Sequence, residues 1–361
     1  MFEYYTATII VSVFAMIILI INTTRSNTLT KEQKFLFRIL FSIIAVAACC
    51  EWLGVLLDGK GGGLRLLHIL VKTLELSISP CIAVVFAMII KRVQTKMVMI
   101  ILVFHAALEI LSGIFGFIFY VDAGNYYYHG SFYAIYVCAY FLSLVYALCI
   151  VLVNMKHYQY SGAVQFFLIA LLILTGAGIQ LFNTSIRVTF GTLGVAASIL
   201  YIVTLEMIQQ TDGLTGLLNR RGFENCVVAE HDACVILFMD VDLFKKINDE
   251  NGHEVGDKIL KIIGRQLRRV YAPYGKCFRY GGDEFAVILR KKRDQVKQLN
   301  ESFKEKLAKE REEEKRVPDV SIGYASFDPK KHILLDIIKE ADENMYHVKQ
   351  AKKAKRKGGE A

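Results

Sequence analysis

The sequence predicts two structural classes in one chain: an N-terminal all-α transmembrane bundle of about seven spans, and a C-terminal α/β domain of the α+β type. The first observation is composition, since 54% of the 361 residues are hydrophobic and the mean hydropathy of +0.39 is too apolar for an ordinary soluble protein. The second is distribution, because this apolar excess lies before residue 207. The third is a change of pattern, because later β-type runs alternate with helical stretches, at about 233–240, 276–280, 285–290 and 319–326.

The N-terminal part contains the apolar runs that such a bundle needs, at about 4–22, 36–57, 67–90, 97–120, 132–154, 164–182 and 187–206. Each is close to the roughly 20 residues that a helix needs to cross a bilayer. The first run is too long, and too weakly basic at its start, for a cleaved signal peptide. We therefore predict a transmembrane sensory or anchor domain at 1–206, a soluble domain at 207–354 and a basic tail at 355–361.

Basic residues in the connecting loops predict the orientation of the bundle. Loops on the side of the soluble domain hold Arg25, Lys31, Lys34, Lys91, Arg92, Lys96 and Lys156, whereas the opposite loops hold only Lys60, Arg65 and Arg187. The positive-inside rule places the richer side in the cytoplasm, and an odd number of spans then places the N-terminus outside. The tyrosine-rich loop VDAGNYYYHG falls outside, where its aromatic residues are predicted to anchor at the membrane interface rather than to form a ligand-binding box.

Several ionisable residues fall within the predicted spans, at Glu51, His68, Lys72, Glu75, His105 and Glu109. Charged groups are expensive in a bilayer, so these side chains should face the bundle interior. Two interpretations stay open: a sensory or proton-linked pocket, and polar contacts that hold helices together. The eight cysteines show no metal-ligand spacing and are interpreted as packing residues.

The net charge of +9 arises partly from the inner loops and partly from the terminal KKAKRK run. No segment resembles a module that reads nucleic-acid bases. Membrane phosphates and substrate phosphates, not nucleic acid, are therefore the predicted partners of this charge.

The most informative string is RYGGDEF at Arg279 to Phe285, which lies between two apolar stretches. Its glycines favour a tight turn with bare backbone, and its two acids are hard oxygen ligands. Upstream, VILFMDVDLFKKIND places Asp240 and Asp242 at the end of another strand, followed by Lys245. Paired carboxylates and a lysine suit magnesium and a triphosphate, although the string alone is also compatible with a solvated hairpin.

Five motifs occur in order: DGLTGLLNRRGF at 212–223, DVDLFKKINDENGHEVGD at 240–257, RYGGDEF at 279–285, SIGYASF at 321–327 and ADENMYHVK at 341–349. Together they resemble the GGDEF family of diguanylate cyclases over about residues 208–353. The resemblance implies a central antiparallel sheet flanked by helices, as in nucleotidyl cyclases and the polymerase palm. It also implies a bacterial membrane enzyme that condenses two GTP molecules into cyclic di-GMP and releases pyrophosphate. In such enzymes a homodimer joins two GTP molecules, one held by each protomer.

The resemblance assigns metal ligands and catalytic groups. Asp240 and the backbone carbonyl of Val241 correspond to metal ligands, and Asp283 corresponds to a further ligand and to the base for the ribose 3′-hydroxyl. Glu284 shares the metal binding, and Lys245 stabilises the transferring phosphate. The implied cofactor is Mg²⁺, with Mn²⁺ as the alternative, at two ions per active site.

The residues that the resemblance assigns to substrate binding are Asn248, His253, Asp257, Gly281, Gly282, Lys349 and Lys353. Asn248 and Asp257 correspond to the pair that reads the guanine edge, where an aspartate can accept hydrogen bonds from guanine N1 and N2. For His253 two roles stay open, a nucleotide contact and orientation of the loop. Lys349 and Lys353 are expected to contact phosphate.

Two departures from the family pattern matter. After Lys349 the chain lacks the usual glycine, basic residue and asparagine. At the inhibitory product site, where many members carry an RxxD motif, this chain has Ala272 and Gly275. We therefore expect no such site and no feedback inhibition through it.

The segment ILYIVTLEMIQQT leads from the last span almost directly into the soluble domain. We expect a continuous helix through which a sensory ligand, unidentified from the sequence, would control dimer geometry. Two other readings stay open: a catalytically silent nucleotide-controlled module, and a transporter or receptor with the cyclase as an accessory output.

Overall fold

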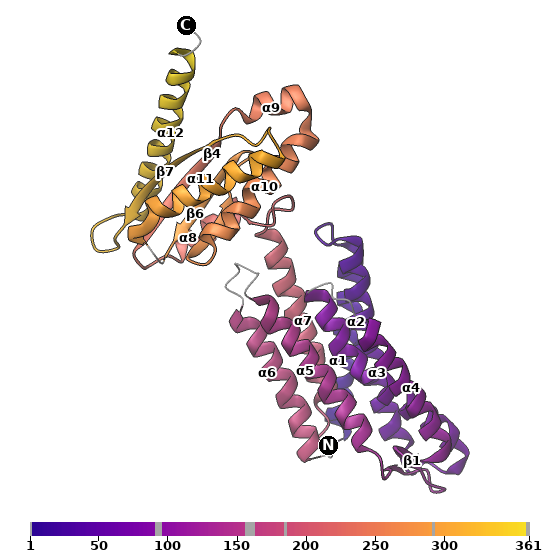
Figure 1. The fold of residues 1–361 in the computed structure, drawn as a ribbon. Coiled ribbons are helices and arrows are strands. Elements are labelled where there is room, and N and C mark those ends of the chain that lie inside the picture. The colour runs from indigo at the N-terminus through magenta and orange to yellow at the C-terminus, as the bar shows by residue number, and fades with distance from the viewer. Residues whose placement is uncertain (1, 91–95, 156–162, 184–185, 291–292, 359–361) are drawn as a thin grey trace. The chain divides into compact units, whose positions relative to one another are not determined.

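The computed structural model describes residues 2–90, 96–155, 163–183, 186–290 and 293–358 (Figure 1). The chain divides into two compact units, Met1–Leu205 and Glu206–Ala361, and each is described by itself. The basic residues Lys91, Arg92 and Lys156, used above for orientation, lie outside the described residues.

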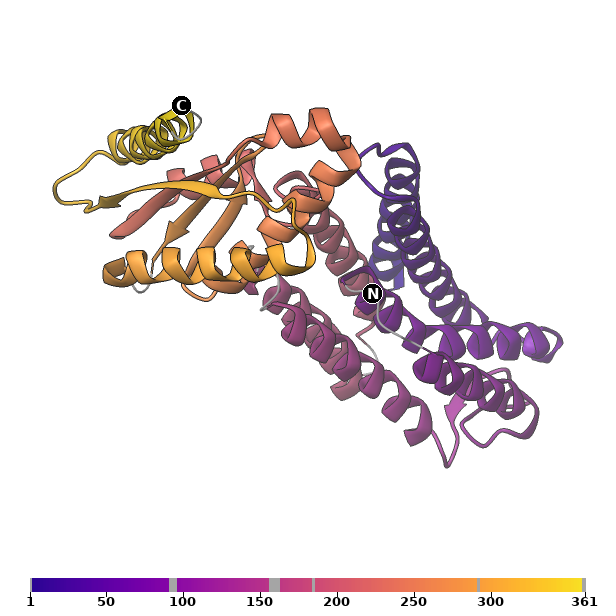
Figure 2. The same cartoon turned by 45° about the horizontal axis from the view of Figure 1, so that its top comes forward.

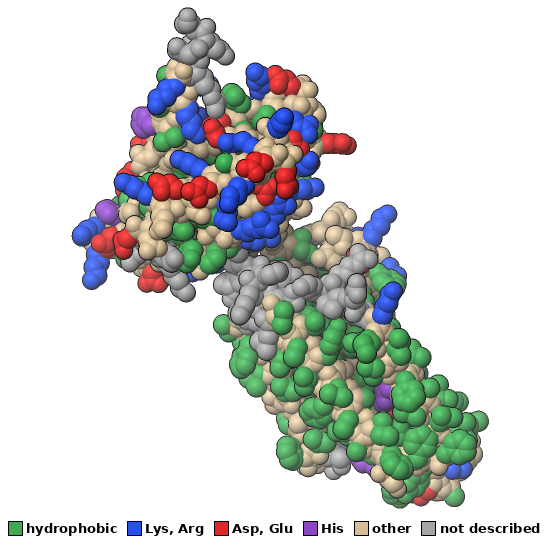
Figure 3. All heavy atoms as spheres, viewed as in Figure 1, with side chains coloured by type: hydrophobic (Ala, Val, Ile, Leu, Met, Phe, Trp, Pro, Cys, Tyr) green, Lys and Arg blue, Asp and Glu red, His purple; other side chains and the backbone are tan. Residues whose placement is uncertain are grey.

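The N-terminal unit is built from the helices α1 (Phe2–Arg25), α2 (Lys31–Leu57), α3 (Arg65–Ile90), α4 (Lys96–Phe115), α5 (Ala134–Met155), α6 (Ala163–Phe182) and α7 (Thr189–Gln209). Helix α7 continues past Leu205, the last residue of this unit. Six helical segments in the described part of the chain are long and apolar enough to cross a membrane, and the apolar stretch of the remaining helix, Ala134–Ile150, is shorter. Apolar side chains cover the face of this unit shown in Figure 3, as a lipid-facing surface requires.

The loop predicted to lie outside folds into a hairpin that the sequence did not predict. Strands β1 (Phe119–Val121) and β2 (Tyr127–His129) pair antiparallel, and the Tyr120 and Tyr128 rings stack at 5.4 Å between centroids. Buried Asn125 adopts a φ of +66° in the turn and donates from Nδ2 to the Leu57 carbonyl at 2.7 Å. The hairpin is therefore fixed to the end of α2.

The C-terminal unit contains a five-stranded sheet in the order β3-β5-β6-β4-β7. Its strands are β3 (Leu218–Asn219), β4 (Cys234–Val241), β5 (Gly275–Arg279), β6 (Glu284–Leu289) and β7 (Val320–Phe327). The β4, β5, β6 and β7 strands pair antiparallel, as predicted, while short β3 pairs parallel to β5 and makes the sheet mixed.

Five helices flank this sheet: α8 (Arg220–Val228), α9 (Phe244–Asn251), α10 (His253–Tyr271), α11 (Val296–Glu313) and α12 (Leu334–Gly358). Side chains alternate along β4, so Leu237 and Met239 pack with α10 and α11, whereas Ile236 and Phe238 pack with α8 and α12. Figure 2 shows the sheet between these helices. The predicted basic tail begins within α12, which continues to Gly358, and residues 359–361 are not described.

Candidate functional site

The two acidic strand ends predicted from the sequence lie side by side in the sheet. Asp240 on β4 is directly opposite Glu284 on β6, and the Val241 amide donates to the Asp283 carbonyl at 3.2 Å. The Tyr280 amide donates to the Glu284 carbonyl at 2.8 Å and closes the hairpin between β5 and β6. The carboxylates of the two motifs therefore share one edge of the sheet.

The two glycines of the turn have different surroundings. A Cβ added at Gly281 would lie 2.6 Å from Glu284 Oε2, so this glycine allows the carboxylate to fold over the backbone. A Cβ at Gly282 would meet no atom within 4 Å. A side chain at Gly281 would thus displace the end of the Glu284 side chain, while the space beside Gly282 is open to a ligand.

Two buried carboxylates face α12, because Asp240 and Asp242 continue the same face of β4 as Ile236 and Phe238. Asp240 is 5% exposed and accepts a hydrogen bond at Oδ2 from Lys349 Nζ at 2.6 Å, while its Oδ1 has no partner among the described residues. Asp242 is 3% exposed and accepts bonds from Lys352 Nζ at 2.7 Å and Ser321 Oγ at 2.6 Å. One helix therefore supplies an ammonium group to each carboxylate.

The pKa values of Asp240 and Glu284 are both raised at this edge of the sheet. Burial raises the pKa of Asp240, and nearby Asp283 and Asp242 add to the rise against the opposing effect of Lys349. Burial also raises the pKa of Glu284, with further contributions from Asp283 and Asp240. Although burial lowers the pKa of Lys349, its bond to Asp240 raises it overall. This edge of the sheet thus has an excess of negative charge that a further cation would relieve.

The donor set fits a divalent metal that is shared with a substrate. Within the described residues, no three His, Cys, Asp or Glu side chains form a preformed metal cluster. The buried Oδ1 of Asp240 nevertheless has no partner, and Glu284 lies opposite on the next strand. Mg²⁺ takes one or two protein carboxylates and completes its shell with phosphate oxygens and water. These residues suit that arrangement better than an all-protein cage.

The residues assigned to guanine lie on two consecutive helices. Asn248 is on α9, His253 begins α10, and Asp257 follows one turn later; Gly252 joins the helices with a φ of +82°. The Oδ1 of Asn248 is buried without a hydrogen-bond partner among the described residues, and a Cβ at Gly256 would collide with it. His253 and Asp257 are exposed, so this region offers an unpaired amide oxygen beside an accessible carboxylate.

Comparison with known proteins identifies the C-terminal unit. Residues 209–355 match the family model described as "Diguanylate cyclase, GGDEF domain". These residues form a GGDEF domain. The match confirms the resemblance carried by the five motifs.

Relatives of this domain include named cyclases. The chain is 40% identical over 92 residues to the probable diguanylate cyclase DgcC of Escherichia coli, which covers 24% of this chain and 25% of that protein. It is 35% identical over 153 residues to the diguanylate cyclase DgcP of the same organism, covering 39% and 45%. The GGDEF domain of DgcB from Caulobacter crescentus, solved in complex with c-di-GMP, is 28% identical, with a TM-score of 0.34 and coverage of 39% and 91%. The chain thus spans less than half the length of these two curated relatives.

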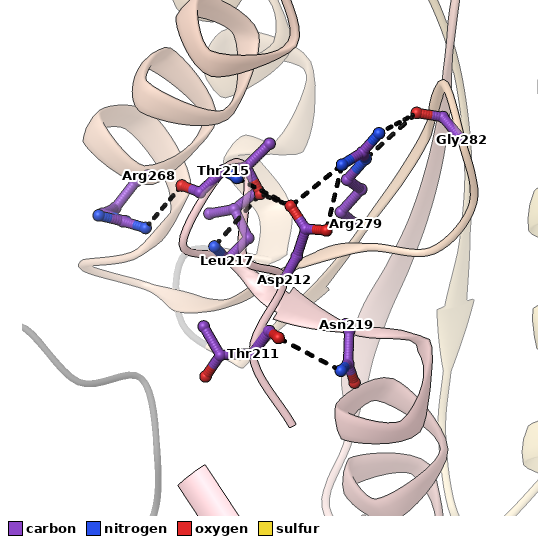
Figure 4. Close-up of polar contacts among 8 residues, drawn as sticks. All are labelled: Thr211, Asp212, Thr215, Leu217, Asn219, Arg268, Arg279 and Gly282. Carbon is purple, nitrogen blue, oxygen red and sulfur yellow. Dashed lines mark hydrogen bonds and ion pairs between the residues drawn. The ribbon is translucent and has the colours of Figure 1, made fainter. Parts of the chain in front are cut away.

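A network at the start of the GGDEF domain was not predicted as part of the site (Figure 4). Asp212 pairs with Arg279 at 3.1 Å between Oδ2 and Nη1, and Arg279 Nη2 donates to the Gly282 carbonyl at 2.7 Å. Thr215 donates to Asp212 from its amide at 2.8 Å and from its hydroxyl at 2.7 Å. Although burial raises the pKa of Asp212, these bonds and Arg279 lower it overall. The first motif is thus tied to the glycine turn.

The lysines of the last motif make different contacts, while the phosphate contacts of Lys349 and Lys353 stay a prediction. Lys349 contacts Asp240 as described, but Lys352, rather than Lys353, reaches Asp242, and Lys353 is exposed. The sequence did not separate these two, because positions three and four residues after Lys349 both return to nearly the same helix face. Lys245 is exposed on α9, after Leu243 in the left-handed conformation with a φ of +58°.

The structure gives a reason why Gly275, at the aspartate position of the RxxD motif, carries no side chain. A Cβ at Gly275 would collide with the backbone of Ile288 and Leu289 on the paired strand. This strand pairing leaves no room for the aspartate of an RxxD motif. The absence of feedback inhibition stays a prediction.

Proposed function

We propose that this protein is a membrane-bound diguanylate cyclase, which condenses two GTP molecules into cyclic di-GMP and two pyrophosphates as a homodimer. The observation that carries the proposal is the sheet edge where Asp240, whose Oδ1 has no partner among the described residues, stands opposite Glu284, and the adjoining turn has open space beside Gly282. Such an edge can hold a cation and a triphosphate together.

The chemistry assigned to the chain is in-line displacement. Asp283 accepts the proton of a ribose 3′-hydroxyl, the oxygen bonds to the α-phosphorus of the partner's GTP, and the bond to pyrophosphate breaks. A second such step closes the ring. Two Mg²⁺ or Mn²⁺ ions, held by Asp240, the Val241 carbonyl, Asp283 and Glu284, would stabilise charge on the phosphate oxygens.

The lysines have a complementary role. Lys349 forms an ion pair with Asp240 through a side chain that is 34% exposed. Phosphate oxygens of a bound triphosphate would compete with Asp240 for this ammonium, because a triphosphate carries more negative charge than one carboxylate. Lys245, exposed at the start of α9, would neutralise charge on the transferring phosphate.

For substrate choice, Asn248 and Asp257 would read guanine, with His253 in the same segment. The unpaired Oδ1 of Asn248 supports this assignment, because it has no partner among the described residues and can accept a hydrogen bond from a base edge.

The N-terminal unit would place the enzyme in the cell membrane as a multi-pass protein, with the N-terminus outside and the GGDEF domain in the cytoplasm. Its six membrane-length apolar helices in the described residues support this assignment. We propose that a sensory ligand acts on these helices and changes the geometry of the dimer through α7. Truncation near Leu205 tests the coupling, and a regulated output that survives truncation would reject it.

The deciding experiment uses the detergent-purified full-length protein with GTP and Mg²⁺ beside an Asp283→Ala variant, with nucleotide products followed by chromatography. Cyclic di-GMP from the wild type alone supports the proposal. Product from both would reject the role of Asp283. If neither forms product, residues 208–361 fused to a constitutive dimeriser separate a missing activator from a silent domain.

A further inference from the structure

The helical unit contains a polar cavity of about 1030 Å³ that the proposed cyclase chemistry does not use. Its walls come from α2, α3, α5, α6, the start of α7 and the β1–β2 hairpin, so it lies at the hairpin end of the unit. Sites for small molecules typically measure about 300–1,000 Å³. The cavity is therefore large enough for a metabolite-sized ligand.

The charged side chains in its lining favour a cation. Three carboxylates stand against two basic groups: Glu51, Asp58 and Glu75 against Lys72 and Arg187. Lys72 Nζ pairs with Glu75 Oε2 at 2.8 Å, which neutralises those two. Two carboxylates, Glu51 and Asp58, then remain in the lining with one guanidinium, Arg187, which is an excess of one negative charge.

Among the carboxylates of the lining, Glu51 is the one best suited to pair with a bound cation. It is 1% exposed, and both of its oxygens accept hydrogen bonds from neutral donors, Tyr5 OH at 2.8 Å and Gln180 Nε2 at 2.7 Å. Within the described residues no lysine, arginine or histidine forms an ion pair with it. Burying a carboxylate that has only neutral donors is costly in its charged form, and a bound cation would offset that cost.

Aromatic rings complete the environment that an ammonium group prefers. Lys72 Nζ already lies 4.9 Å from the centroid of the Tyr127 ring, so the cavity wall holds one ammonium between a ring face and a carboxylate. Tyr133, Tyr136 and Tyr140 follow as a row with centroid distances of 5.6 and 6.2 Å. Tyr140 lines the cavity, is 8% exposed, and its hydroxyl has no partner among the described residues.

We propose that this cavity binds a small organic cation, an amine or quaternary ammonium compound with an apolar body, with Glu51 as its counter-ion and the tyrosine rings around its charge. Binding at this site does not depend on the cyclase activity. Arg187, which also lines the cavity, would favour an anion, so a series of ligands that differ only in charge decides the question.

The test is isothermal titration calorimetry of the full-length protein in detergent micelles. Phenethylammonium is compared with phenethyl alcohol and with anionic hydrocinnamate, and choline is compared with its neutral carbon isostere. We expect at least one cation to bind tenfold or more tightly than its neutral partner, and hydrocinnamate to bind more weakly than either. This measurement needs no variant and so does not depend on a substitution that impairs folding.

Two variants then locate the site. Glu51→Gln should weaken binding of the cation tenfold or more and leave that of the neutral partner within twofold. Glu109→Gln is the matched control, because Glu109 is 0% exposed in the same unit and does not line the cavity. Trp52, the one tryptophan of the chain, is adjacent to Glu51 and donates to Thr6 Oγ1, so its fluorescence gives a second readout.

Four outcomes would overturn the proposal: equal binding of cation and neutral isostere, tighter binding of the anion, no binding of either cation, and equal losses in the two variants. Because binding is measured directly, a protein that makes no cyclic di-GMP but binds the cation refutes only the proposed activity. A protein that makes the product but shows any of these four outcomes refutes only the cation site.

Discussion

Two buried carboxylates, one in each unit, hold negative charge in different ways. Asp240 in the GGDEF domain has an ammonium on one oxygen, Lys349 Nζ at 2.6 Å, and no partner on the other among the described residues. Glu51 in the helical unit has a neutral donor on each oxygen, Tyr5 OH and Gln180 Nε2. The first carboxylate is paired with an ammonium of the protein, whereas the second is held by neutral donors.

The difference fits the two ligands proposed. Lys349 is partly exposed, so it can exchange the carboxylate for phosphate at little cost in desolvation. A polyanionic substrate with its metal therefore suits the Asp240 edge. Within the described residues Glu51 has no ionic partner to exchange, so an added cation forms an ion pair without breaking one.

The largest effect should come from removing the charge of Asp240. Asp240→Asn keeps the shape of the side chain but loses the carboxylate that a metal needs, so we expect product formation to fall by about 100-fold or more. The measurement is the rate of cyclic di-GMP formation over a series of Mg²⁺ concentrations. Asp336→Asn, at an exposed position on α12, is the control and should keep nearly full activity. Retained activity in Asp240→Asn would reject its role.

The two glycines of the turn should separate folding from binding. Gly281→Ala forces a Cβ against Glu284, so we expect lower thermal stability and activity reduced about tenfold. Gly282→Ala meets no atom within 4 Å, so stability should be unchanged. If a phosphate approaches the backbone there, Gly282→Ala should raise the KM for GTP about tenfold. Thermal unfolding and steady-state kinetics of both variants check this, and an unchanged KM would place the phosphate elsewhere.

Adjacent lysines on α12 offer a third comparison. Lys352→Ala leaves buried Asp242 without its ammonium, so we expect a loss of about 1–3 kcal/mol of unfolding free energy. Lys353→Ala removes an exposed side chain and should cost less than about 0.5 kcal/mol. Urea unfolding of residues 206–361, which form a compact unit, measures both. Equal losses would contradict the separate roles assigned here.

The sequence predicted the parts of this domain that depend on local pattern. Apolar runs located β4, β6 and β7, and the acids at their ends located Asp240 and Glu284 on one edge. Contacts that depend on tertiary placement were not predicted. The ion pair of Asp212 with Arg279 joins residues 67 positions apart, and the choice of Lys352 over Lys353 depends on how α12 lies on the sheet. The cavity also required assembly, because its walls come from several separate segments.

The smallest effect concerns the bond between the first motif and the glycine turn, and it should depend on pH. The Thr215 and Arg279 bonds outweigh the effect of burial and lower the pKa of Asp212 below its unfolded value of about 3.9. Its contribution to stability is therefore present above that value and is lost as the pH falls through the folded pKa. Asp212→Asn should cost about 1 kcal/mol at neutral pH, because the ion pair and a charge-assisted hydrogen bond are removed.

The difference between wild type and Asp212→Asn should shrink toward zero as the pH falls through the folded pKa of Asp212, because both side chains are then uncharged. Urea unfolding of residues 206–361 between neutral and acid pH measures it. Asp232→Asn, at an exposed position of the same domain, is the control. A difference for Asp212 that stays constant across the range would show that its hydrogen bonds, and not its charge, hold the first motif to the turn.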